Sequence, residues 1–274
     1  MTLTVSADPP VERRSIVVPA VLTNIAYGLS LPLVLLLAWE SSSRFGWLPQ
    51  QILPAPQVVW ATLVELWNDG SLVDHTLRSL WRVAAGFSVG ALSGLAIGAA
   101  LGLLPRIRAF IWPVFTAIAQ VNMLAWLPLL VLFIGIDEEL KYVSIAWSTA
   151  IPVILATTRA ITNVSPKLLE LGRVLDFTPL QRFFTIVLPA SLPLLFTGIR
   201  EGLASAWQNL VIVELFASFE GLGYLMVWGR QLFQLEIVIA AMIVIAAIGL
   251  LLNASLEYLE RFVQPWKTDA AHAR

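Results

Sequence analysis

Few residues of this 274-residue chain could do catalytic chemistry, and they do not converge. Cysteine is absent, which excludes disulfides, thiolate metal ligands and cysteine nucleophiles. The two histidines, His75 and His272, stand alone, without a second ligand at the spacing of a metal site. A catalytic centre would need a histidine pair or a carboxylate cluster, and neither is evident. We therefore expect neither a metal site nor an enzyme.

The chain also lacks a nucleotide-binding loop. The pattern G-x-x-x-x-G-K-[ST] does not occur, and no glycine is followed by lysine. Any ATP that drives this protein must therefore be hydrolysed on another chain. We expect no cofactor on this chain, with ATP and Mg²⁺ held by a partner.

A concentrated set of charges lies in the stretch Ser165–Pro189, between two long apolar runs. Its opening serine precedes a proline, which predicts a capped helix that Asp176 ends. Thr178 and Gln181 have the spacing of a capping box, in which each side chain satisfies a backbone N–H of the other residue, so a second helix begins there. The final proline is expected to close it. These two helices would lie outside a membrane, and their mixed apolar and charged surface suits docking to another protein.

Composition indicates a membrane protein that crosses the bilayer several times. The chain is 58% hydrophobic and only 13% charged, with a mean hydropathy of +0.81. Ordinary soluble domains are roughly 25% charged. The net charge of −1 gives no basic excess, so a nucleic-acid partner is not expected and membrane lipid is.

The N-terminus combines a polar arm with an apolar run. Residues 1–14 are polar and predict a disordered cytoplasmic arm. Arg13 and Arg14 also resemble a twin-arginine export signal. However, Ser15–Trp39 is free of charge over 25 residues, longer than the roughly 7–15 residues of a signal core, and no small-residue cleavage site follows. An uncleaved first span is favoured.

Five further apolar blocks complete a prediction of six spans in a domain over residues 15–268, followed by a tail over 269–274. With the N-terminus inside, most Lys and Arg residues fall on the inner side. Both termini and the 165–189 stretch are then cytoplasmic. Residues 57–67 predict an interfacial helix on the outer face. The five blocks are Val83–Pro105, Ala109–Ile136, Tyr142–Thr158, about Leu192–Ala217, and Ile237–Leu256.

Glycines recur every four residues in the second span. A row of small residues at this spacing lets another helix approach closely. Packing within one subunit is a better explanation of the row than a ligand site. The row is Gly86, Gly90, Gly94, Gly98 and Gly102.

The charged stretch carries a recognisable pattern. Glu170, Leu171 and Gly172 are followed by three residues, Asp176, nine residues, and the sequence Ile-Val-Leu-Pro ending at Pro189. This is similar to the pattern E-A-A, three residues, G, nine residues, I-x-L-P of the membrane subunits of ATP-binding-cassette (ABC) importers. Leu-Gly stands in place of Ala-Ala, and Asp176 in place of glycine. Because aspartate tolerates positive φ better than most residues, we expect Asp176 to preserve the turn.

Other segments resemble the taurine, aliphatic sulfonate and nitrate branch of these permeases. They are Leu53–Pro56, Ala125–Leu129, Gly198–Leu203 followed by Trp207, and Glu214 with Gly221–Gly223. The resemblance implies an all-α membrane protein of the bacterial inner membrane, with the six-helix architecture of type I ABC importer permeases. It implies a homodimer that imports a small anionic solute, with two ATPase subunits below it and a periplasmic binding protein above it. A stand-alone channel or secondary carrier is the alternative.

The resemblance also implies site residues. The two cytoplasmic helices would be coupling helices seated in a groove of the ATPase. One of Phe183 and Phe184 is expected to cover the underside of the transmembrane bundle, and the other to reach the ATPase. The predicted coupling residues are Glu170, Leu171, Gly172, Arg173, Asp176, Phe177, Thr178, Pro179, Phe183, Leu188 and Pro189.

Polar residues at bilayer depth are candidates for the translocation path. Asn122, Gln208 and Asn209 would be costly against lipid, so they should face the path or a neighbouring helix. Glu214 follows twelve uncharged residues and should lie near the outer mouth. Its charge repels anions, which makes it a gate or a structural partner rather than a ligand. The predicted path comprises Asn122, Trp126, Trp207, Gln208 and Glu214, while Arg200 and Glu201 are expected to pair locally.

Overall fold

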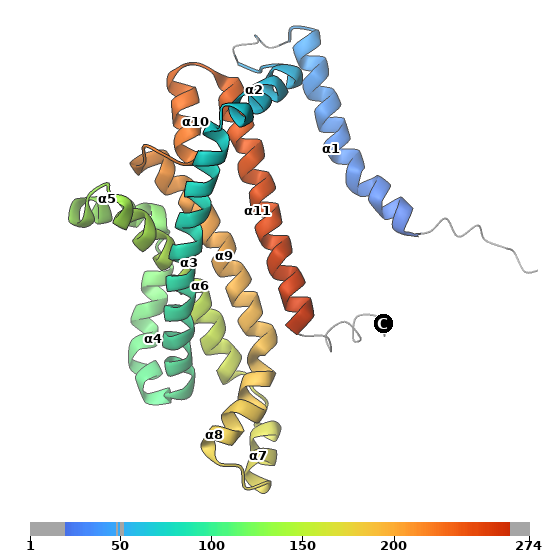
Figure 1. Cartoon of the computed structure of the whole chain (residues 1–274). Coiled ribbons are helices and arrows are strands. Elements are labelled where there is room, and N and C mark those ends of the chain that lie inside the picture. Colours follow the sequence, from blue (N-terminus) through green and yellow to red (C-terminus); the bar gives the residue numbers. More distant parts are fainter. Residues whose placement is uncertain (1–19, 48, 50–51, 264–274) are drawn as a thin grey trace, which may run out of the picture. The chain divides into compact units, whose positions relative to one another are not determined.

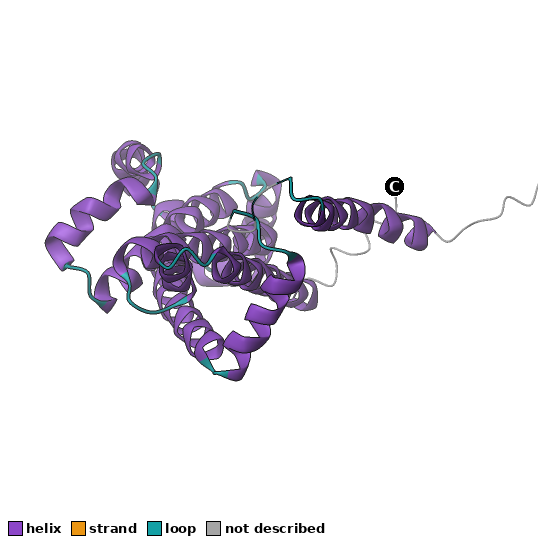
Figure 2. Ribbon diagram, turned by 90° about the horizontal axis from the view of Figure 1, so that it is seen from above, coloured by secondary structure: helices purple, strands orange, loops and turns teal. Residues whose placement is uncertain are grey.

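The computed structural model describes residues 20–47, 49 and 52–263, in which all regular structure is helical (Figures 1 and 2). These residues form two compact units, which divide between Pro56 and Gln57. The predicted arm over residues 1–14, the start of the first predicted span and the predicted tail over 269–274 lie outside the described residues.

The first unit contains one long helix, α1 (Ala20–Arg44), where the first span was predicted. Its side chains from Leu31 to Leu37 include six large apolar groups that are more than half exposed, as lipid-facing positions are. Near the helix end, the Trp39 indole N–H donates to the Pro54 carbonyl at 2.9 Å. Arg44 pairs with Glu40 one turn earlier, at 2.5 Å.

The second unit contains the remaining helices. Four are long and apolar enough to cross a membrane: α3, α6, the continuous helix Pro179–Ala217, and α11. The bent pair α4–α5 makes a fifth candidate. The predicted helix over residues 57–67 is present as α2. The elements are α2 (Pro56–Asn68), α3 (Ser71–Leu103), α4 (Pro105–Ala119), α5 (Met123–Ile134), α6 (Glu138–Thr162), α7 (Pro166–Val174), α8 (Pro179–Arg182), a π-helical turn (Phe183–Val187), α9 (Leu188–Ala217), α10 (Leu222–Gln231) and α11 (Leu235–Val263).

The composition of the apolar block Ala109–Ile136 suggested one straight helix, and the structure differs from this prediction. The block divides into α4 and α5, whose axes are bent by 95°. Asn122 takes an extended conformation at the break, and its Oδ1 accepts a hydrogen bond from the Leu124 N–H at 2.9 Å. The amide therefore caps α5 and replaces a backbone bond that a continuous helix would have made.

Pro189 was expected to close the second coupling helix, and this prediction was wrong. The chain stays helical from Pro179 to Ala217, over 39 residues, so the span also begins earlier than the predicted Leu192. A proline ring clashes with the carbonyl four residues before it. The π-helical turn Phe183–Val187 lies where that carbonyl would be, and the Leu188 N–H reaches back five residues to the Phe183 carbonyl. Its wider turn accommodates the proline without ending the helix.

The glycine row of α3 packs directly on α6, which confirms the predicted close approach. A Cβ added at Gly90 would lie 2.4 Å from the Ala146 carbonyl oxygen, so no side chain fits there. The partner face of α6 also repeats every four residues, because the glycines at 86, 90, 94, 98 and 102 lie against Ile145, Thr149, Val153, Thr157 and Ile161. Gly198 and Gly202 of α9 approach α6 as closely from another side. Helices α3, α6 and α9 therefore form one tightly packed group.

Candidate functional site

The segment between α6 and α9 holds α7 and α8 at one end of the second unit (Figure 1). Ser165 occupies the predicted cap position of α7, although its side chain makes no capping hydrogen bond. The Phe177 N–H bonds to the Gly172 carbonyl at 3.0 Å, and the Asp176 N–H to the Arg173 carbonyl at 3.1 Å. This is the Schellman pattern that ends many helices, with its left-handed residue at Asp176. Asp176 has a φ of 51°, as its place in the motif predicted.

Two further local features fix this segment. The predicted capping box of α8 is present: the Thr178 N–H donates to Gln181 Oε1 at 2.9 Å, and the Gln181 N–H to Thr178 Oγ1 at 3.3 Å. Gly172 is buried, and a Cβ there would lie 2.6 Å from the Ile186 Cδ1 atom. Glycine at this position therefore lets α7 pack closely on the π-helical turn.

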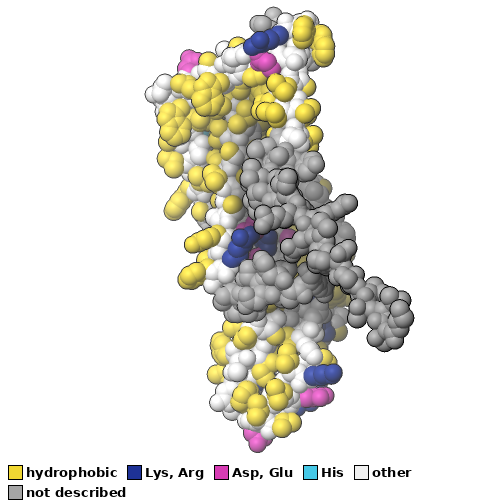
Figure 3. All heavy atoms as spheres, turned by 90° about the vertical axis from the view of Figure 1, so that its right-hand side faces the viewer, with side chains coloured by type: hydrophobic (Ala, Val, Ile, Leu, Met, Phe, Trp, Pro, Cys, Tyr) yellow, Lys and Arg dark blue, Asp and Glu magenta, His cyan; other side chains and the backbone are white. Residues whose placement is uncertain are grey.

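The surface of α7 and α8 is apolar and charged together. Figure 3 shows hydrophobic side chains beside charged ones at its lower end, where α7 and α8 lie. Glu170 and Arg173 are exposed, as predicted for docking residues. The exposed large apolar side chains of the segment are Leu168, Leu171, Val174, Leu175, Leu180 and Phe184. Within the described chain each of them is between 41% and 79% exposed.

Phe183 and Phe184 have different surroundings, as expected. Phe183 was predicted as a coupling residue, but it is Phe184 that is exposed. Phe183 and Leu188 line an apolar groove along α3, α6 and α9, so both lie against the bundle. Phe184 is 57% exposed and contacts Phe183 edge to face, with ring centroids 5.2 Å apart. Phe184 is therefore the aromatic side chain that is free to meet a partner.

A polar cavity of about 360 Å³ lies between α6, α9 and the α4–α5 break. Its polar groups on α9 recur every three or four residues, so they occupy one face of that helix. They are Thr197, Glu201, Ser205, Gln208 and Asn209; Ser148 and Arg159 of α6 and Asn122 complete the polar lining. Asn209 is 5% exposed, and its Nδ2 has no hydrogen-bond partner among the described residues.

The cavity brings together only part of the predicted path. Asn122 and Gln208 line it. Trp207 instead packs on α11, where its indole N–H donates to the Ile245 carbonyl at 3.2 Å. The Trp126 ring packs on Trp147, with centroids 6.0 Å apart. Glu214 lies outside the cavity lining, so three of the five predicted path residues contact other helices instead.

The pairing expected for Arg200 and Glu201 is also different. Arg200 forms an ion pair with Glu260 of α11, while Glu201 lines the cavity. Sequence reasoning did not single out Ser148, Thr197 or Ser205 for the cavity. The spacing of Thr197 and Ser205 on one face of α9 was the available signal, whereas Ser148 lies on α6. Hydroxyl groups in apolar helices commonly bond to their own backbone, so they attract little notice.

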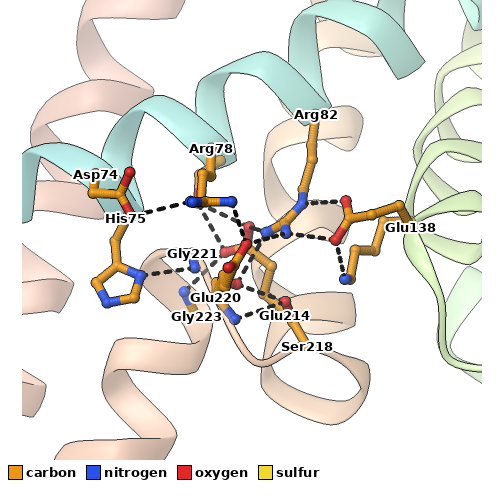
Figure 4. Close-up of polar contacts among 12 residues, drawn as sticks. Asp74, His75, Arg78, Arg82, Glu138, Glu214, Ser218, Glu220, Gly221 and Gly223 are labelled. Carbon is orange, nitrogen blue, oxygen red and sulfur yellow. Dashed lines mark hydrogen bonds and ion pairs between the residues drawn. The ribbon is translucent and has the colours of Figure 1, made fainter. Parts of the chain in front are cut away.

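Glu214 is at the centre of a buried ion-pair cluster at the far end of α9 from α7 and α8 (Figure 4). Its side chain is fully buried. Arg82 Nη1 donates to Glu214 Oε1 at 2.8 Å, and the Ser79 hydroxyl lies 2.8 and 2.9 Å from the two carboxylate oxygens. Arg82 also makes two hydrogen bonds to Glu138 of α6, at 2.7 and 2.8 Å. Lys141 supports Glu138 at 2.5 Å.

The same cluster satisfies the backbone N–H groups that begin α10. The Gly221 N–H donates to His75 Nδ1 at 3.0 Å, the Leu222 N–H to Ser79 Oγ at 2.9 Å, and the Gly223 N–H to Glu214 Oε2 at 2.9 Å. The unpaired N–H groups at a helix start need such acceptors. His75, Ser79 and Arg82 are spaced four and three residues apart, so they project from one face of α3.

Comparison with known proteins places these features in context. The sequence profile of the family described as "Binding-protein-dependent transport system inner membrane component" matches residues 90–266. The chain belongs to this family.

Relatives of known transport class agree with that assignment. The permease is 36% identical over 242 residues to the putative aliphatic sulfonates transport permease SsuC of Bacillus subtilis (strain 168), with 88% of each chain covered. It is 31% identical over 238 residues to the taurine transport system permease TauC of Escherichia coli (strain K12). The matched region covers 85% of this chain and 86% of TauC. The sequence prediction of an ABC importer permease in this branch is therefore confirmed.

Solved structures support the fold. The structure titled "Inward facing conformations of the MetNI methionine ABC transporter" matches with a TM-score of 0.58 at 16% identity, covering 69% of this chain and 96% of the other. An amino acid ABC transporter structure matches with a TM-score of 0.59, covering 74% of this chain and 97% of the other. The permease therefore has the all-α fold of an ABC importer membrane subunit and crosses the membrane several times.

The glycine that begins α10 gives a direct test of the buried cluster. Gly221 has a φ of 103°, and a Cβ there would lie 2.2 Å from Glu214 Oε1. Gly70 has a similar φ of 80°, but a Cβ would meet nothing within 4 Å. We predict that Gly70→Ala lowers the free energy of unfolding by about 1–2 kcal/mol, the cost of the left-handed backbone alone. Gly221→Ala should cost about 1–3 kcal/mol more, because φ 103° with ψ 172° is open almost only to glycine, unlike φ 80° with ψ −7° at Gly70, and because the added Cβ also displaces the carboxylate.

Thermal or denaturant unfolding of the two variants in the same detergent measures this difference. Equal losses of stability for Gly70→Ala and Gly221→Ala would show that the Glu214 side chain is not held where the structure has it.

Proposed function

We propose that this permease forms half of a homodimeric path that imports a small oxyanion. A binding protein delivers the solute on the outer side, and two copies of a separate ATPase drive transport from the cytoplasm. The substrate class rests on relatives that are permeases for aliphatic sulfonates, for taurine and, in Synechocystis, for bicarbonate. All of these solutes are oxyanions or carry one.

The polar cavity is the observation that carries this proposal. Amide and hydroxyl groups inside apolar helices must be satisfied by protein, water or solute, because lipid offers no partners. The amides of Asn122, Gln208 and Asn209 and the nearby hydroxyls supply neutral donors for an oxyanion. Arg159 and Glu201 contribute one charge of each sign to the lining. Such a surface would bind an anion weakly, as passage requires.

The other half of the proposal concerns energy coupling. The exposed side chains of α7 and α8 combine apolar area with charge, which suits a groove on a second protein. The positions of Lys and Arg along the chain favour a cytoplasmic side for this segment and both termini. ATP and Mg²⁺ would be bound by the ATPase. Closure of two ATPase subunits would then rock the two permease copies about their interface, so that the path opens to alternate sides.

Substitutions in the cavity test the path. In the double variant Gln208→Ala/Asn209→Ala, we predict about fivefold or greater loss of solute uptake, because each of the two lost hydrogen bonds is worth about 0.5–1.5 kcal/mol. Assembly with the ATPase should be unchanged. The control Asn68→Ala removes an exposed amide on α2, outside the cavity, and should transport like the wild type.

Uptake is measured in proteoliposomes that contain the ATPase and the binding protein. Wild-type uptake by the double variant would contradict the assigned path. Uptake by the permease alone, without its partners, would instead support a channel or secondary carrier.

The turn at Asp176 tests the coupling segment. Glycine adopts a φ of 51° freely, so Asp176→Gly should retain ATPase binding and uptake. Valine is branched at Cβ and strained at this φ by about 1–2 kcal/mol or more, so Asp176→Val should disrupt the turn between α7 and α8. We predict at least a fivefold loss of ATPase binding for Asp176→Val, since about 1 kcal/mol corresponds to about fivefold. Copurification of the two subunits measures it, and equal binding by both variants would contradict the docking role.

A further inference from the structure

One helix connects three parts of this permease. The continuous helix Pro179–Ala217 is about 58 Å long at 1.5 Å per residue. It begins in the coupling segment at α8, and its middle turns carry the polar face of the cavity from Thr197 to Asn209. Glu214 lies less than one turn before the other end. A displacement of the coupling segment therefore reaches the cavity through a single element.

The far end of this helix is fixed to three other helices. Glu214 is bonded to Ser79 and Arg82 of α3 and to the Gly223 N–H of α10. Arg82 in turn makes its paired hydrogen bonds to Glu138, in the first turn of α6. Arg82 Nη1 also donates to the Glu220 carbonyl at 2.9 Å, which fixes the turn between α9 and α10.

The type of contact matters as much as its position. Apolar contact is non-directional, so it constrains the end of α9 less than hydrogen bonds of fixed geometry do. An arginine with paired hydrogen bonds to a carboxylate holds only in one geometry. Burial makes the requirement strict, since a displaced Glu214 would leave a charge without partners inside the protein. The end of α9 therefore cannot shift along α3 without breaking the whole cluster.

We propose that Arg82 and Glu214 are positioning residues for transport, which make α9 move together with α3, α6 and α10. Because the far end of α9 is held, a displacement of the coupling segment turns the polar face of the cavity together with α3, α6 and α10, as one rigid body. Without the cluster, the far end of α9 would no longer be held to α3 and α10, and ATP hydrolysis would move the path less efficiently. This inference rests on the proposed function, because it takes an ATPase at α7 and α8 as the source of the displacement.

The test compares the solute imported per ATP hydrolysed. The double variant Arg82→Met/Glu214→Leu removes both charges, so neither is left unpaired inside the protein. The matched control is Arg78→Met/Glu220→Gln, which removes a half-exposed ion pair of the same cluster, at 2.6 Å. Both are assembled with the ATPase and the binding protein in proteoliposomes.

For Arg82→Met/Glu214→Leu we expect ATP hydrolysis within about twofold of the wild type and an import-to-hydrolysis ratio at least about tenfold lower. The control should keep the wild-type ratio. An unchanged ratio in the first variant, or a parallel loss of hydrolysis and import, would overturn the proposal.

Should that variant fail to assemble, Glu214→Gln decides the question. Glutamine keeps the shape of the side chain but removes its charge and one acceptor, so the ratio should fall by about threefold or more; a wild-type ratio would overturn the proposal. The wild-type complex provides a separate reference. Absence of ATP-driven import there would refute the proposed function itself, before any variant is compared.

Discussion

The structure of the second unit depends on one buried carboxylate. Removing a charged group from water costs on the order of several kcal/mol, which is offset only if its partners are complete and well placed. Glu214 has such a set, in the Ser79 hydroxyl, the Arg82 guanidinium and the Gly223 N–H. The hydroxyl and the guanidinium belong to α3, and the N–H belongs to the start of α10. The requirement therefore determines where α3, α9 and α10 meet, and it explains why the residue at 221 has no side chain.

Close packing of uncharged groups holds α3, α6 and α9 together along their length. The glycines of α3 meet β-branched side chains of α6 at matching intervals of four residues, and two glycines of α9 approach α6 from another side. Packing of this kind brings the backbones of α3, α6 and α9 together. The chain departs from the helix at the break between α4 and α5, and the polar cavity lies beside it. Rigid packing and one polar opening are what a permease that alternates as a body requires.

Local features of this architecture were predictable from the sequence, and long-range ones were not. The capping box at Thr178 and the positive φ at Asp176 follow from the residues themselves, as do the long apolar helices. The partners of Glu214 do not, because 132 residues separate it from Arg82 and no spacing rule relates them. Pro189 was misjudged because the π-helical turn before it accommodates the proline within a continuous helix. Trp126 and Trp207 were misplaced because amphipathic rings suit helix contacts as well as a path.

The central claim is that the coupling segment and the far end of α9 move as one body. The most direct test is a distance between spin labels on the same chain at Ser165, an exposed residue at the start of the coupling segment, and at Phe219, which is 73% exposed. It is measured in the assembled transporter, with only one permease copy labelled, without nucleotide and with ATP bound. The account predicts the same distance in both states, while the distance between Ser165 labels on the two copies changes. A change within one chain of about 5 Å or more, equal to a full helical turn, would contradict it.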